Sequence, residues 1–239
     1  MAIVKWLRPR VVIPIFVSSN LTSHPKFMKR KIAIFLHNPI AERACVLGMI
    51  EALSNNYSIR VFTEDEVEHS VIKKADIVAF PGGRGDADNF DKIFKNTKDV
   101  IREYMDRGGR YLGICMGAYW AGKHYFNILN DVECIQYIKR KSSEIKRSFP
   151  TSVIVDWNGE QQDMFFYDGP AFRGKKKNFK VLAKYSNGDP MAIFQKKIGL
   201  IGCHPESKKS WYKPYMKDSW HDYYHHGLLL DFTNKLYER

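Results

Sequence analysis

The stretch from Arg110 to Lys123, "RYLGICMGAYWAGK", joins an apolar strand pattern to a turn and the start of a helix. Gly113 and Gly117 stand two residues on either side of Cys115. This G-x-C-x-G spacing is the thiol form of the nucleophile elbow, in which the turn holds the nucleophile in a strained backbone conformation. Both glycines are needed because a Cβ would keep strand and helix apart. The stretch therefore predicts an α/β fold with Cys115 at the tip of a turn.

Strand and helix patterns alternate on the amino-terminal side of this turn. The apolar runs predict strands over 31–38, 57–63 and 75–80, the last of them stopped by Pro81, Gly82 and Gly83. Amphipathic patterns predict helices over 41–56 and 90–109. Such alternation with short loops is typical of a mostly parallel central sheet that is covered by helices on both faces. In this architecture the loops after the carboxyl ends of the strands carry the site.

The carboxyl-terminal side has a different pattern. Residues 151–203 contain short strand candidates divided by Asn-Gly, Asp-Gly and Asn-Gly-Asp-Pro turns, which predict antiparallel hairpins added to the sheet. Within them "FFYDGPAF", residues 165–172, is expected to form a hairpin; either its tip presents Tyr167, Asp168 and Phe172 to the site, or its aromatic side chains fill the core. Residues 218–239 are predicted to form a closing helix.

Two further strand ends carry residues that suit thiol chemistry. In "AFPGGRGD", the backbone N–H groups of Gly82 and Gly83 follow an apolar strand, and with the N–H of Met116 they would form an oxyanion hole; a plain β-turn is the alternative. In "IGLIGCHPES", His204 would take the thiol proton and Glu206 would orient the imidazole; a capped turn is the alternative. For the thiol itself, the alternative is a small buried core residue.

The three motifs "PGG", "GICMGAY" and "HPE" resemble the class I glutamine amidotransferase superfamily. That resemblance implies a flavodoxin-like, three-layer α/β sandwich with a Cys-His-Glu triad. It assigns Cys115 as the nucleophile, His204 as the general base and Glu206 as the orienting carboxylate. Gly83 and Met116 become the oxyanion donors.

Within the superfamily, "GAY" after the cysteine and "FFYDGPAF" resemble the N-terminal domain of some biotin-protein ligases. The residues that we expect at the substrate are Gly82, Tyr119, Tyr167 and Asp168. Glutamine-hydrolysing members usually carry Gln four positions after the nucleophile, where this chain has Tyr119, so the resemblance leaves the use of glutamine open. The sequence shows no Gly/Arg-rich biotinyl-adenylate loop, and we do not expect the chain to ligate biotin by itself.

About half of the formal net charge of +12 lies in the first thirty residues, which contain Lys and Arg but no Asp or Glu. We therefore divide the chain into a basic N-terminal extension, residues 1–30, and an amidotransferase-like domain, residues 31–239. For the extension, a start at Met28, a sorting signal and an added strand are the open interpretations. The lysine runs elsewhere lack interleaved aromatics, so a solvated surface is favoured over nucleic-acid binding.

The remaining patterns bear on compartment, membrane and metal. No apolar run approaches the roughly eighteen residues of a membrane span. The four cysteines form no C-x-x-C pair, which favours a reducing, cytoplasmic setting. His221, His225 and His226 are interpreted as a polar helix surface instead of a metal site, and no metal or cofactor is expected.

Two functions follow from the sequence. The first is a thiol-dependent hydrolase or amidotransferase that attacks a small-molecule or peptide-like amide. The second is a non-catalytic binding or regulatory module of the same fold, which acts with a separate ligase or synthase. The complete set Cys115, His204 and Glu206 favours the enzyme, and Tyr119 favours the module.

Overall fold

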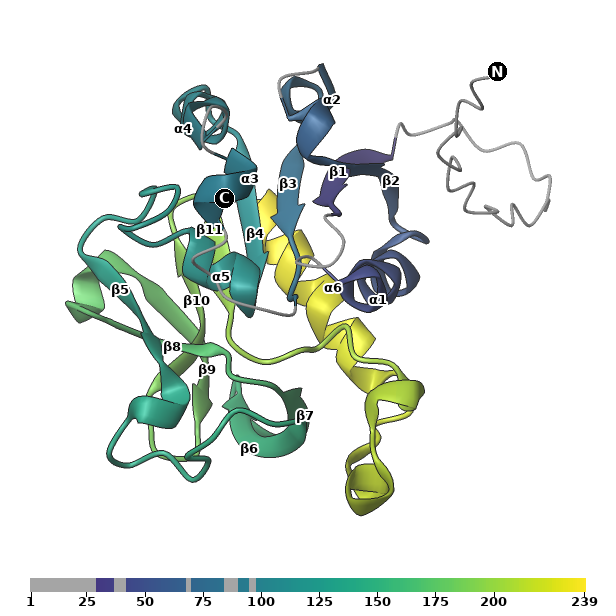
Figure 1. The fold of residues 1–239 in the computed structure, drawn as a ribbon, viewed down its shortest axis with the longest axis vertical. Helices are drawn as coiled ribbons and strands as arrows, with labels where there is room; N and C mark the ends of the chain where they lie inside the picture. The colour runs from purple at the N-terminus through teal and green to yellow at the C-terminus, as the bar shows by residue number, and fades with distance from the viewer. Residues whose placement is uncertain (1–28, 37–41, 68–69, 84–89, 95–97) are drawn as a thin grey trace, which may run out of the picture.

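The computed structural model describes residues 29–36, 42–67, 70–83, 90–94 and 98–239. Residues 1–28 of the predicted extension lie outside this part, so the boundary at residue 30 stays a prediction. One nine-stranded sheet runs through the described residues in the order β2-β1-β3-β4-β11-β10-β9-β6-β7 (Figure 1). Its first five strands pair in parallel: β2 (Tyr57–Phe62), β1 (Arg30–Phe35), β3 (Ile77–Phe80), β4 (Arg110–Ile114) and β11 (Ile198–Ile201).

The other strands of the sheet pair antiparallel, as the turn-rich sequence predicts. They are β10 (Pro190–Gln195), β9 (Lys180–Tyr185), β6 (Thr151–Trp157) and β7 (Glu160–Phe166). A separate two-stranded sheet, β5 (Val132–Gln136) with β8 (Pro170–Gly174), lies beside them (Figure 1). The predicted combination of a mostly parallel sheet with added hairpins is confirmed.

Helices cover both faces of the parallel strands and make the three predicted layers. Along β1, Ile32 and Ile34 pack into one hydrophobic core while Ala33 and Phe35 pack into the other, because successive strand side chains point to opposite faces. The first core is closed by α1 (Arg43–Leu53) and α6 (Tyr224–Tyr237), which lie side by side in Figure 1. The second is closed by α2 (Ser70–Lys73), α3 (Phe90–Phe94), α4 (Lys98–Asp106) and α5 (Met116–Trp120).

Several predicted helix bounds differ from those observed. The helix expected over 90–109 is represented by α3 and α4, and α5 is only five residues long. The closing helix begins at Tyr224 and not at Asp218, because Asp222 and Tyr223 have positive φ angles of 46° and 66° that stop it from extending backwards. Short 3-10 helices lie at Glu64–Glu66, Tyr137–Lys139, Lys176–Asn178, Lys209–Trp211 and Pro214–Ser219. Among the described residues, no helix has the length and apolar character that crossing a bilayer requires.

The segment "FFYDGPAF" is not a hairpin, which corrects the sequence prediction. Strand β7 pairs with β6, and β8 pairs with β5, so residues 167–169 connect two different sheets. A Cβ on Gly169 would overlap the carbonyl oxygen of Gly202, so only glycine lets this connection lie against the end of β11. Phe172 is buried in the second core and does not line the cavity described below.

The predicted polar surface of histidines is also wrong, because two of the three are buried. His225 is 1% exposed and His226 is 7% exposed. The rings of His221 and His225 lie 3.7 Å apart between centroids, and Nε2 of His226 is 3.0 Å from the carbonyl oxygen of Ser207. These side chains therefore pack the start of α6 against the loop that follows His204.

This packing predicts an acid-dependent loss of stability. Burial, then the neighbouring His221 and His226, lower the pKa of His225 to about 3. The unfolded chain, with a histidine pKa near 6.5, binds the proton more readily, so stability is complete above about pH 6.5 and falls as pH decreases. Because of His225, we expect the free energy of unfolding to fall by about 1 to 2 kcal/mol when the pH is lowered from about 7 to 5.

Urea unfolding at both pH values measures this contribution. The His225→Gln variant should lose less stability on acidification than the wild type. His124→Gln, which changes an exposed histidine, should keep the wild-type slope. Equal slopes in all three proteins would show that His225 is not held neutral by its surroundings.

Candidate active site

Three neighbouring parallel strands end at the same edge of the sheet and bring the predicted motifs together. Strand β4 lies between β3 and β11, with Ile114 opposite Ile201 in the register. The N–H of Cys115 donates to the carbonyl oxygen of Ile201 at 2.9 Å, and the N–H of Gly117 donates to that of Pro81 at 3.2 Å. The turn that carries Cys115 is thus bonded to the loops on both sides.

The backbone at Cys115 has the strained conformation that the elbow predicts. Its φ and ψ angles are 49° and −105°, a region that non-glycine residues rarely adopt. A Cβ at Gly113 would stand 2.6 Å from the carbonyl oxygen of Gly117, and one at Gly117 would overlap the backbone of Phe80. Both glycines are therefore required by close backbone approach, which confirms that part of the prediction.

The thiol of Cys115 lies at the inner end of the site. The residue is 5% exposed and packs with the first core. Its sulfur donates to the carbonyl oxygen of Tyr167 at 3.4 Å. The connection between the two sheets therefore forms one wall beside the thiol.

His204 and Glu206 form a buried pair next to it. Nδ1 of His204 lies 2.9 Å from Oε1 of Glu206, and the two residues are 4% and 0% exposed. This contact fixes the tautomer that carries the proton on Nδ1 when the ring is neutral, and it leaves Nε2 to accept a proton. Burial alone would lower the pKa of His204, but the Glu206 carboxylate and the interactions with Cys115 and Cys45 raise it well above its usual value.

The loop around this pair is held from several sides. The N–H of His204 donates to the carbonyl oxygen of Phe165 at 2.9 Å, and the N–H of Ser207 donates to that of His204 at 3.1 Å. On the far side, a Cβ on Gly48 of α1 would overlap the carbonyl oxygen of Glu206. Helix α1 thus packs directly against the loop, and the His204–Glu206 geometry depends on that contact.

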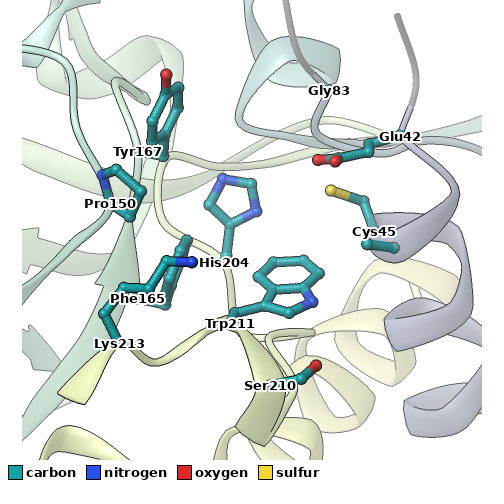
Figure 2. A pocket seen from close by; sticks show the side chains of 11 residues that line it. Glu42, Cys45, Gly83, Pro150, Phe165, Tyr167, His204, Ser210, Trp211 and Lys213 are labelled. Atoms are coloured by element: carbon teal, nitrogen blue, oxygen red, sulfur yellow. The ribbon is translucent and has the colours of Figure 1, made fainter. Parts of the chain in front are cut away.

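A second thiol, which the sequence analysis did not select, belongs to this cluster. The Cys45 sulfur, a ring nitrogen of His204 and a carboxylate oxygen of Glu206 all lie within 4.8 Å of one another. Figure 2 shows the Cys45 sulfur pointing toward the imidazole ring of His204. Burial raises the pKa of Cys45 to about 12, so its thiol keeps its proton at neutral pH. A Cβ on Gly82 would overlap Cε1 of His204 and stand 3.3 Å from the Cys45 sulfur, so glycine is needed there as well.

A cavity of about 360 Å³ opens onto this cluster (Figure 2). The rings of Phe165 and Trp211 stand edge-on to the imidazole of His204, each with its centroid 5.7 Å away. Cys115 does not line the cavity, although Tyr167, which accepts its hydrogen bond, does. The lining residues are Glu42, Ala44, Cys45, Gly83, Pro150, Phe165, Tyr167, His204, Ser210, Trp211 and Lys213.

The residues expected at the substrate are only partly brought together. Tyr167 and Gly83 line the cavity, and Gly82 contacts His204. Tyr119 and Asp168 do not line the cavity, and the Tyr119 hydroxyl donates to the carbonyl oxygen of Asp168 at 3.2 Å. The Asp168 carboxylate accepts from Nε2 of Gln136 at 2.9 Å, so its side chain is turned away from the cavity lining.

The sequence comparison agrees with the amino-terminal half of this site. Residues 38–136 match the family described as biotin-protein ligase, N terminal. The predicted family resemblance is confirmed. The matched residues include Cys45, the Gly82–Gly83 loop and the Cys115 turn, whereas His204 and Glu206 lie beyond the match. No curated protein sequence matches the chain.

Solved structures with a similar fold include glutamine amidotransferases. One from Thermotoga maritima has 13% identity and a TM-score of 0.63, over 88% of this chain and 99% of that one. One from Methylobacillus flagellatus has 11% identity and a TM-score of 0.58, over 88% and 93%. A further glutamine amidotransferase has 18% identity and a TM-score of 0.56, over 87% and 99%. At these identities the likeness establishes an amidotransferase-like fold.

Proposed function

We propose that the chain is a thiol-dependent, amidotransferase-like hydrolase that acts on a carboxamide or peptide-like carbonyl through Cys115, His204 and Glu206. The observation that carries the proposal is the strained elbow at Cys115 beside a buried imidazole whose Nδ1 is 2.9 Å from a carboxylate. A structural histidine would not need a fully buried carboxylate partner. A general base that must hold a proton during the reaction does.

The chemistry follows the usual order for a thiol nucleophile. Nε2 of His204 takes the Cys115 proton, and the sulfur attacks the carbonyl carbon while the carbonyl π electrons move to oxygen. The backbone N–H groups of Gly83 and Met116 would stabilise the resulting oxyanion. Collapse of the tetrahedral intermediate breaks the C–N bond, and His204 gives its proton to the leaving amine. Water, or the amine of a partner protein's substrate, then releases the acyl group from sulfur.

The cavity suggests which amides fit. Its floor beside His204 is made by the aromatic rings of Phe165 and Trp211, and Tyr167 adds a third ring. Tyr119, which stands where glutamine-hydrolysing relatives carry Gln, is engaged with Asp168. We propose an amide that carries an apolar or ring-containing group in preference to free glutamine.

Intact-mass spectrometry tests this function directly. The wild-type protein, incubated with a panel of amides and activated acyl esters that includes glutamine, should gain the mass of one acyl group on Cys115. Cys115→Ser should gain no thioester adduct. Cys134→Ser should behave as the wild type, because Cys134 does not line the cavity and its thiol donates to the backbone carbonyl oxygen of Ala118. An adduct that persists in Cys115→Ser would contradict the assignment.

One observation favours the non-catalytic module as a second candidate. Cys115 is 5% exposed and does not line the cavity, so a ligand in the cavity meets Cys45 and His204 first. In this case the chain would bind an amide-like ligand and act with a separate ligase or synthase. Saturable ligand binding without any adduct on Cys115 would favour the module.

For either function we propose a cytoplasmic setting, supported by four cysteines that are all free.

A further inference from the structure

The Cys45, His204 and Glu206 side chains, here called the thiol-imidazole-carboxylate cluster, have the composition of a metal site. Among the described residues, it is the one group of three or more such side chains whose ligand atoms lie this close together. Thiolate, imidazole and carboxylate together suit a zinc-type ion, which takes three protein ligands and keeps a fourth position open in accessible sites. In a tetrahedral zinc site neighbouring ligand atoms are roughly 3.3 to 3.8 Å apart. The observed limit of 4.8 Å therefore requires a contraction of at most about 1.5 Å.

An unpartnered oxygen points to the same conclusion. Glu206 is 0% exposed, and its Oε2 atom has no hydrogen-bond partner among the described residues. A buried carboxylate oxygen without a partner carries a large desolvation cost. Coordination of this oxygen to a cation would remove that cost.

The charges also balance. A thiolate at Cys45 and a carboxylate at Glu206 would bring two negative charges into a buried site, where a neutral His204 adds none. A divalent cation cancels them, whereas the same two anions without a cation would repel each other at close range. Binding releases the Cys45 proton, and the ion supplies the stabilisation that the free thiolate lacks.

We propose that the thiol-imidazole-carboxylate cluster binds a divalent zinc-type ion that blocks the proposed hydrolase. Binding of the ion does not depend on the proposed function. Only the predicted block of hydrolysis rests on it. With His204 bound to the ion, its ring no longer accepts the Cys115 proton, and Glu206 no longer orients it. The cavity beside Cys45 and His204 gives the ion its way in and leaves its fourth position to water.

Cobalt substitution tests the site without an activity assay. The full-length, metal-stripped protein titrated with Co²⁺ should bind one ion and show thiolate-to-cobalt charge-transfer absorption, which Zn²⁺ should remove. Cys45→Ser should lose this absorption and bind Co²⁺ at least about tenfold more weakly. Cys134→Ser should retain both properties. Equal affinity and absorption in Cys45→Ser, or no binding by the wild type, would overturn the proposal.

A second arm separates this inference from the proposed function. Cys115→Ser, which cannot form the acyl adduct, should still bind Co²⁺ through Cys45. In the wild type Zn²⁺ should suppress adduct formation on Cys115, and in Cys45→Ser the suppression should need at least about ten times more Zn²⁺, each relative to its own metal-free rate. Co²⁺ binding without any adduct rejects the hydrolase and keeps the metal site. Adduct formation that Zn²⁺ does not suppress rejects the metal regulation and keeps the hydrolase.

Discussion

His204→Gln is expected to lower the turnover of a reactive amide by at least about a thousandfold. Glutamine keeps a polar side chain of similar reach but cannot take the proton from Cys115. The loss should appear mainly in kcat, because the imidazole acts on the reacting atoms and not on the bound amide as a whole. Steady-state kinetics with the amide that gives the adduct measures it.

The control for this variant changes a histidine outside the site. His124→Gln alters an exposed side chain and should keep wild-type kcat and KM. A folded His204→Gln protein that retains more than about a tenth of wild-type kcat would remove His204 from the role of general base.

Gly117→Ala is expected to destabilise the fold by at least about 3 kcal/mol. The added methyl group would overlap the carbonyl oxygen of Phe80. Phe80 is 0% exposed and packed in an aromatic core, so β3 cannot move away from the methyl group. For a chain of this size the midpoint of thermal unfolding should fall by at least about 6 °C. Differential scanning calorimetry gives both quantities.

The matched control is another glycine on a helix. Gly227 in α6 is exposed, and a Cβ there would meet nothing within 4 Å. Gly227→Ala should therefore stabilise the protein by about 0.5 to 1 kcal/mol, because alanine loses less backbone freedom in a helix. A Gly117→Ala protein as stable as the wild type would show that the turn tolerates a side chain and that the close approach to β3 is not required.

The parallel half of the fold was predictable from local patterns, and the two-stranded sheet was not. Strands β1, β3 and β4 are short apolar runs, which is the signal of a buried parallel strand. Strand β5 pairs with β8, far along the chain. The alternation of apolar and polar residues within a strand does not reveal a pairing strand so far along the chain. The sequence pattern of "FFYDGPAF" therefore predicts a local hairpin instead.

The site was predictable where one rule applied. Cys115 and His204 each follow a strand, and residues at the carboxyl ends of parallel strands meet at one edge of the sheet. Cys45 satisfies the same rule, since it lies in the first turn of the helix after β1, but an isolated cysteine in an apolar helix pattern is usually a core residue. Trp211 ends the short 3-10 helix Lys209–Trp211, which does not directly follow a strand, so the same rule does not select it.

The central claim is that His204 acts on the sulfur of Cys115, and the alkylation rate of that thiol tests it most directly. Iodoacetamide labelling of Cys115, followed by peptide mass spectrometry at neutral pH, should be at least about tenfold slower in folded His204→Gln than in the wild type. Cys134, which lies outside the cluster of Cys45, His204 and Glu206, should keep its wild-type rate. Equal labelling of Cys115 in the two proteins would contradict the account.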